Sequence, residues 1–136
     1  MMFLLDTCAA IWLMDGSQVS KDVENAFEES FGKNQNILIC PYTAWEVGML
    51  CSKGRLALIK GPIGWYNDLI GINGFEEAYL SPEIMIKSSF LEGEPPKDPG
   101  DRMIIATANK YEATIITRDK KILAYAAAGG CKALEC

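Results

Sequence analysis

The amino-acid sequence predicts an α/β fold, a three-layer α/β/α sandwich with a mostly parallel sheet of about five strands. Short, continuous apolar runs such as 37–40 alternate along the chain with segments of helical character. Apolar runs of this length are typical of parallel strands that are buried on both faces. The chain has 136 residues, of which 49% are apolar. We therefore expect a single domain over 1–136 with a sizeable core.

The first half of the chain contains clear helix and strand signals. Ser20 is a typical N-cap, and Val23, Phe27 and Phe31 after it repeat at the spacing of one helix face. The elements expected here are strands over 3–5 and 37–40 and helices over 8–14, 21–32, 44–52 and 62–71.

The second half continues the alternation. Ser81 and Asp98 each precede a proline, which is favoured at the first position of a helix. The run 114–117 is rich in β-branched residues and predicts a strand. The elements expected here are a weaker strand over 78–80, helices beginning at 82 and 99, the strand over 114–117, a helix over 120–125 and a final strand over 132–134.

Composition restricts the chemistry. Histidine is absent, which excludes a Ser-His-Asp triad, a Cys-His pair and a histidine-ligated zinc. Thirteen basic and eighteen acidic residues give a net charge of −5. A strongly basic chain would indicate nucleic-acid binding. Here any affinity for a polyanion needs a local basic rim or a bound cation.

Cysteine usage and hydropathy indicate a reducing compartment. The five cysteines are an odd count, and no two have C-x-x-C spacing. This pattern suits the cytosol better than a disulfide framework. No uncharged apolar run approaches the ~18 residues of a membrane span. We expect a cytoplasmic protein with no membrane partner.

Four acids, here called the acidic quartet, need an explanation: Asp6, Glu46, Asp101 and Asp119. Asp6 and Asp119 follow two of the expected strands, and Glu46 and Asp101 lie in the first turns of two helices. Because parallel strands end at the same edge of a sheet, the quartet is expected to converge there. Two carboxylates ~4 Å apart repel by about 4 kcal/mol at an effective dielectric near 20. Oxygen ligands select Mg²⁺ or Mn²⁺ to offset this repulsion.

Helix capping is the alternative for each acid alone. Thr43 and Glu46 have the spacing of a capping box. Asp98 is a good N-cap, to which Asp101 would return the reciprocal bond, and Asp6 and Asp119 precede short helices. Capping and metal binding are compatible, because helix N-termini attract carboxylates. The functional interpretation therefore rests on the set of acids and on the shared edge.

Several blocks extend this pattern over nearly the whole chain: 4–8, 44–46, 53–56, Trp65, 80–84, 98–108 and 117–125. In this order and spacing they resemble a PIN-domain ribonuclease, specifically the VapC-type toxin of a bacterial toxin–antitoxin pair. The resemblance places the acidic quartet on the catalytic and metal-binding acids of the family, and Asp98 on an accessory acid. Lys97 stands where many relatives have histidine, which affects contacts of the loop more than the chemistry.

The resemblance implies metal-assisted hydrolysis of an RNA phosphodiester. Asp6 and Asp101 would hold Mg²⁺ or Mn²⁺, with Asp119 a ligand directly or through water. Glu46 would orient or deprotonate the attacking water, and the products would carry a 5′-phosphate and a 3′-hydroxyl. The implied partners are the RNA substrate, a cognate antitoxin that inhibits the enzyme, and a second copy in a homodimer.

Residues around the quartet have further candidate roles. Thr117 is an accessory candidate that would hydrogen-bond a carboxylate or a bound water, or serve only as a strand residue. Arg102 is expected to pair with a neighbouring acid. The three tryptophans are interpreted as core residues rather than platforms for bases. Candidate RNA-phosphate contacts are Lys53, Arg55, Arg118, Lys120 and Lys121. For the first two of these, a role at a helix C-terminus is favoured.

Two other functions compete. A receiver-like phosphoacceptor also has a parallel sheet and an acidic Mg²⁺ pocket, but it needs an acid pair after the first strand, where only Asp6 stands. A PIN-like module that binds RNA or protein without cleavage is the second alternative. The presence of the whole quartet argues against it.

Overall fold

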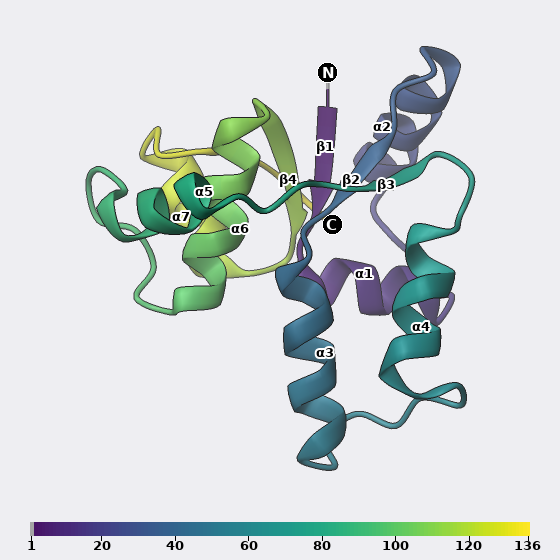
Figure 1. Ribbon diagram of the computed structural model, residues 1–136. Coiled ribbons are helices and arrows are strands. Elements are labelled where there is room, and N and C mark those ends of the chain that lie inside the picture. Colours follow the sequence, from purple (N-terminus) through teal and green to yellow (C-terminus); the bar gives the residue numbers. More distant parts are fainter. Residues whose placement is uncertain (1) are drawn as a thin grey trace.

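The computed structural model describes residues 2–136 and contains a wholly parallel, five-stranded sheet in the order β3-β2-β1-β4-β5 (Figure 1). The strands are β1 (Met2–Leu5), β2 (Ile37–Ile39), β3 (Phe75–Glu77), β4 (Ala113–Thr117) and β5 (Lys132–Glu135). In receiver-like sheets the first strand lies between the second and the third. Here β1 lies between β2 and β4, so the receiver-like alternative is wrong.

Helices cover both faces of the sheet, which confirms the predicted three layers. The helices are α1 (Thr7–Met14), α2 (Lys21–Gly32), α3 (Tyr42–Ser52), α4 (Gly61–Ile70), α5 (Pro82–Lys87), α6 (Pro99–Lys110), α7 (Lys120–Ala127) and a 3-10 turn, η1 (Ser88–Phe90). Alternate residues of β1 face two separate cores. Phe3 and Leu5 pack with α1, α2, α3 and α4, whereas Leu4 packs with α6 and α7.

The helix starts that the sequence marks are found in the structure. The Ser20 hydroxyl accepts a hydrogen bond from the Val23 amide at 3.2 Å, and Ser81 caps α5 in the same way through the Ile84 amide at 3.1 Å. Asp98 caps α6. These caps are local, because donor and acceptor lie three residues apart, and a short sequence pattern specifies them.

The predicted position of the third strand is wrong. The strand expected over 78–80 is absent, and β3 lies three residues earlier, with Phe75 opposite Ile37. β3 is an edge strand with two exposed glutamates. An apolar run indicates a strand that is covered on both faces. β3 is not such a strand, because its position is set by hydrogen bonds to β2, and so the apolar run at 78–80 predicted the wrong residues.

The carboxyl edge of the sheet is the lower edge in Figure 1. β1 runs downwards to it, and α6 begins at the same level. The paired helices α3 and α4 extend beyond it as an arm. The carboxyl edge therefore lies between this arm and the first turn of α6. Every helix within residues 2–136 is too short or too polar to cross a membrane.

Candidate active site at the carboxyl edge

The acidic quartet comes from four different elements. Asp6 follows β1 directly, and Asp119 lies two residues beyond β4. Glu46 lies in the second turn of α3 and Asp101 in the first turn of α6. Because Leu5 is paired with Ile116, the ends of β1 and β4 are level. This register brings the two strand-end acids to the same part of the sheet edge.

Asp6 is a buried carboxylate, with 5% of its surface exposed. One of its oxygens, Oδ1, accepts the Ala9 amide at 2.7 Å and caps α1. The other, Oδ2, accepts a hydrogen bond from the Thr117 hydroxyl. Burial is the largest influence on the pKa of Asp6 and raises it, the two bonds lower it, and the charges of Asp119 and Glu46 raise it, so that the pKa lies above its usual value. Capping and an electrostatic role thus coexist in this residue.

The surroundings of Asp101 raise the pKa of its carboxyl group strongly. Its pKa is raised from 3.8 to about 7, first by burial and then by the charges of Asp119, Asp98, Glu46 and Asp6. Within residues 2–136, its carboxylate accepts no hydrogen bond and forms no ion pair with a basic side chain. A half-buried carboxylate without compensation favours its protonated form.

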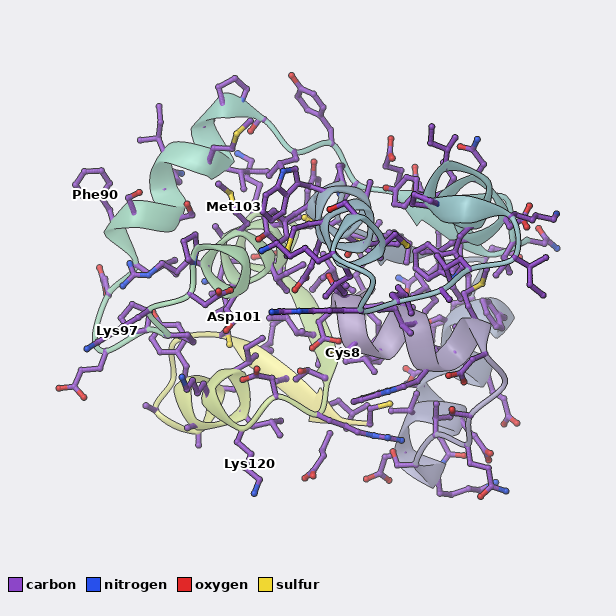
Figure 2. All side chains as sticks on the ribbon, turned by 90° about the horizontal axis from the view of Figure 1, so that it is seen from below. Cys8, Phe90, Lys97, Asp101, Met103 and Lys120 are labelled. Carbon is purple, nitrogen blue, oxygen red and sulfur yellow. The ribbon has the colours of Figure 1, made fainter. Side chains whose placement is uncertain are left out.

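The quartet acts as one electrostatic group. The same four carboxylates that couple to one another also raise the pKa of the Cys8 thiol to about 11, after the contribution of partial desolvation. Figure 2, which looks onto the carboxyl edge, shows Cys8 and Asp101 in the central part of the view. Across residues 2–136, however, no three acidic or cysteine side chains form a cluster that could enclose a metal ion.

The predicted caps are partly confirmed. Asp98 accepts the Asp101 amide at 2.9 Å, and Asp119 accepts the amides of Lys121 at 2.8 Å and Ile122 at 3.0 Å. The capping box of Thr43 and Glu46 is wrong, because α3 starts earlier, at Tyr42, after Pro41.

The two residues of that predicted box have other surroundings. The Thr43 hydroxyl lies 3.0 Å from the Thr7 hydroxyl, inside the protein. The Glu46 carboxylate accepts no hydrogen bond within residues 2–136. Capping therefore does not account for Glu46.

Thr117 joins two members of the quartet. It is fully buried, and its hydroxyl donates to Asp6 while accepting the Asp119 amide at 2.9 Å. One hydroxyl thus fixes the orientation of the first acid and the backbone that carries the second. Its accessory role, one of two alternatives from the sequence, has a geometric basis.

The predicted phosphate-contact residues are in different surroundings. Arg118 donates to the carbonyls of Cys136 at 2.9 Å and Gln18 at 3.1 Å, and its guanidinium lies 4.0 Å from the centre of the Trp12 ring. Its charge is therefore engaged within the protein. The expected pairing of Arg102 with a neighbouring acid is wrong. Its Nε donates to the Pro96 carbonyl at 2.8 Å, and it forms no ion pair within residues 2–136.

The four lysine and arginine candidates that remain are all exposed: Lys53, Arg55, Lys120 and Lys121. Lys53 caps the far end of α3, about 10 Å along the helix from Glu46 at 1.5 Å per residue. Lys120 and Lys121 begin α7, directly after Asp119. Figure 2 shows Lys120 at the periphery, pointing away from Asp101. The two lysines of α7 are thus nearer in sequence to the quartet than the pair after α3.

Sequence reasoning missed an aromatic pair beside the quartet. The sequence predicts Trp45 to be a core residue like Trp65, but 60% of its surface is exposed while Trp65 is buried. Tyr42 packs on it, with ring centres 5.5 Å apart. α3 carries apolar residues on nearly every face, so the pattern does not tell which of them faces solvent. The only available signal was the position of Trp45 next to Glu46.

Comparison with known proteins agrees with this fold. VapBC2 from Rickettsia felis, solved with a promoter DNA fragment, matches with a TM-score of 0.70 and 16% identity, covering 99% of this chain and 98% of that one. A toxin–antitoxin complex from Klebsiella pneumoniae matches with a TM-score of 0.62 and 22% identity, over 97% and 95%. DNA-bound VapBC from Salmonella typhimurium gives 0.68 and 17%, over 99% and 98%.

These identities are low, so the structural matches establish the fold alone. No curated protein matches the sequence. The family model of the PIN domain matches residues 3–128, which is nearly the whole chain and includes every member of the acidic quartet. The chain belongs to the PIN domain family.

Proposed function

We propose that this protein is a Mg²⁺- or Mn²⁺-dependent endoribonuclease that acts as the toxin of a toxin–antitoxin pair. One observation carries the nuclease part: four carboxylates from four elements influence one another at the carboxyl edge, and no basic side chain within residues 2–136 pairs with them. Such an arrangement costs stability. Binding of a cation at this site would explain why the four carboxylates are placed together in spite of the lost stability.

The donor set fits a hard divalent cation. All four side chains offer carboxylate oxygens, the ligands that Mg²⁺ and Mn²⁺ prefer. Mg²⁺ is commonly held by one or two carboxylates and several waters rather than by a complete protein cage. The lack of a three-residue cluster within residues 2–136 is consistent with that mode of binding. Asp6 and Asp101 would hold the ion, with Asp119 a ligand directly or through water.

The side chains have separable roles in phosphodiester hydrolysis. A bound divalent cation supplies Lewis-acid chemistry, because it makes water more acidic and neutralises charge on phosphate oxygens. Glu46 orients or deprotonates the attacking water, since its carboxylate is not engaged by any hydrogen bond within residues 2–136. Thr117 holds Asp6 in place and positions the Asp119 backbone. In-line attack leaves a 5′-phosphate and a 3′-hydroxyl.

The metal requirement is directly testable. Purified protein is expected to cleave a structured RNA in Mg²⁺ or Mn²⁺ and to be inactive in EDTA, with activity returning when excess metal is added. The 5′ ends of the products should accept ligation without prior phosphorylation. Cleavage that persists in EDTA would reject the mechanism. Binding of RNA without any cleavage in either metal would favour the non-cleaving alternative.

The toxin role rests on the similarity to structures described as toxin–antitoxin complexes. The proposed partners are an antitoxin encoded beside this chain and a second copy in a homodimer. Induced expression of the chain alone is expected to arrest bacterial growth, and co-expression of the small neighbouring protein should restore it. The Glu46→Gln variant is the control, because it should not arrest growth. Growth arrest by that variant would contradict the proposal that RNA cleavage causes the toxicity.

A further inference from the structure

The aromatic pair defined by Tyr42 and Trp45 has no role in the chemistry described above. Trp45 is on the outer side of α3 with 60% of its surface exposed, next in sequence to Glu46. The ring of Tyr42 supports it from the preceding turn, with an angle of 32° between the two ring planes. The two rings together therefore present an aromatic face to solvent directly beside a member of the quartet.

The position of Tyr42 is fixed by the first turn of α6. A Cβ atom on Gly100 would lie 2.5 Å from both Cε2 and the hydroxyl oxygen of Tyr42, so the ring occupies space that any other residue at this position would fill. The carboxylates of Glu46, Asp98 and Asp101 are close enough to raise the pKa of the Tyr42 hydroxyl to about 12, after the effect of burial. The pair therefore connects the acidic quartet to the exposed surface of α3.

We propose that Trp45, supported by Tyr42, stacks on an unpaired base of the RNA next to the phosphodiester that is cleaved. This inference rests on the proposed nuclease function and extends it. Arg118 is engaged within the protein, so of the candidate phosphate contacts near the quartet only Lys120 and Lys121 extend freely from the surface. Stacking on an aromatic face binds nucleic acid without using charge, and every base offers such a face.

A base is favoured over a protein side chain by this connection to the quartet. An RNA strand with one phosphate at the acids must place the adjacent nucleotides close by, and Trp45 is the residue next to Glu46, while Tyr42 packs against Gly100, the neighbour of Asp101. A rigid ring held in place before binding loses little entropy when a base stacks on it. The site is expected to accept all four bases, with a preference for those that stack most strongly.

The first test compares Trp45→Ala with Phe90→Ala, which removes another exposed aromatic ring, on η1 and away from Cys8 and Asp101 in Figure 2. On a short single-stranded RNA that contains one cleavage site, Trp45→Ala is expected to raise KM about 10-fold while kcat changes little. Trp45→Phe should restore most of the affinity, and Phe90→Ala should behave as the wild type. An unchanged KM in Trp45→Ala would overturn the proposal.

The second test identifies the base. Substrates that lack one base at a time are cleaved by the wild type and by Trp45→Ala. At a single position beside the cut, base removal should weaken the wild type as much as Trp45→Ala does, and should have no further effect on the variant. Additive losses at every position would show that Trp45 does not contact a base. A Trp45→Ala variant defective only in binding its antitoxin would assign the ring to that protein instead.

A binding measurement separates this inference from the nuclease function. The Asp101→Asn protein is expected to bind RNA without cleaving it, and stacking should quench tryptophan fluorescence in this background. The quench should disappear when Trp45→Phe is added, although Trp12 and Trp65 remain. Quenching in the Asp101→Asn protein, together with no cleavage of RNA by the wild type, would reject the nuclease and keep the stacking site. RNA binding with an unchanged quench in the Trp45→Phe protein, or no RNA binding at all, would reject the stacking site.

Discussion

Asp101→Asn is expected to lower the rate of metal-dependent RNA cleavage by roughly 100-fold or more. Asparagine keeps the size of the side chain and the Asp98 cap on the residue 101 amide, so the first turn of α6 should be retained. The variant loses the negative oxygen that would hold the cation. Cleavage is measured at saturating Mg²⁺, with Glu94→Gln, in the exposed loop before α6, as the control that removes one charge elsewhere. Wild-type activity in Asp101→Asn would remove this residue from the site.

The same substitution is expected to stabilise the metal-free protein at alkaline pH. The pKa of Asp101 rises from 3.8 in the unfolded chain to about 7 in the fold, so the folded state holds the proton more tightly. Stability from this group is complete below pH 3.8 and is lost as pH rises to about 7. A shift of this size, reduced because the group is only half buried, amounts to about 2 kcal/mol.

Urea denaturation in EDTA measures this effect. Asp101→Asn should be more stable than the wild type at pH 8 and should lose the advantage near pH 4, while Glu94→Gln follows the wild type at both. Mg²⁺ should raise the stability of the wild type at pH 8 more than that of Asp101→Asn, because a cation relieves the repulsion that the substitution has already removed. Equal pH profiles for the wild type and Asp101→Asn would contradict the raised pKa.

Thr117→Val is expected to reduce both cleavage and stability. Valine has nearly the same shape as threonine, but it leaves one Asp6 oxygen and the Asp119 amide without their partner. Loss of a group that orients a metal ligand typically costs about 10- to 100-fold in activity. An unsatisfied buried polar group costs about 1–3 kcal/mol. Both the cleavage rate and the free energy of unfolding should therefore fall.

Two variants control for this substitution. Thr114→Val lies on the same strand, three residues earlier, and removes a buried threonine that does not contact the quartet. It should keep wild-type activity. Thr117→Ser retains the hydroxyl and should restore most of the cleavage rate. If Thr117→Ser is as inactive as Thr117→Val, the methyl group and not the hydrogen bond is responsible.

The sequence predicted correctly those features that depend on adjacent residues, such as helix caps, and the strands that are buried on both faces of the sheet. The strands 3–5 and 114–117 and the caps at Ser20 and Ser81 are found as predicted. In each case the signal is contained within a few adjacent residues. The carboxyl-edge position of the acids follows from the same logic, because the direction of a parallel strand determines which end its next residue occupies.

The remaining features depend on partners that are distant in the chain. Arg118 binds carbonyls that are 18 and 100 residues away, so no local pattern distinguishes it from a free cation. β3 is positioned by its bonds to β2, and its own composition is not that of a buried strand. The exposure of Trp45 depends on how α3 is rotated in the assembled fold. Periodicity cannot decide this for a helix that is apolar all round.

The dual use of Asp6 and Asp119 has an evolutionary consequence. Both aspartates cap helices, so replacing either one would penalise folding as well as the proposed catalysis. A gene copy that had lost its selective value as a nuclease would therefore still retain these two residues, and their presence in a relative is poor proof of enzymatic competence. Glu46, which caps no helix, would drift first, and under the proposed mechanism its identity would be the better marker of a working relative.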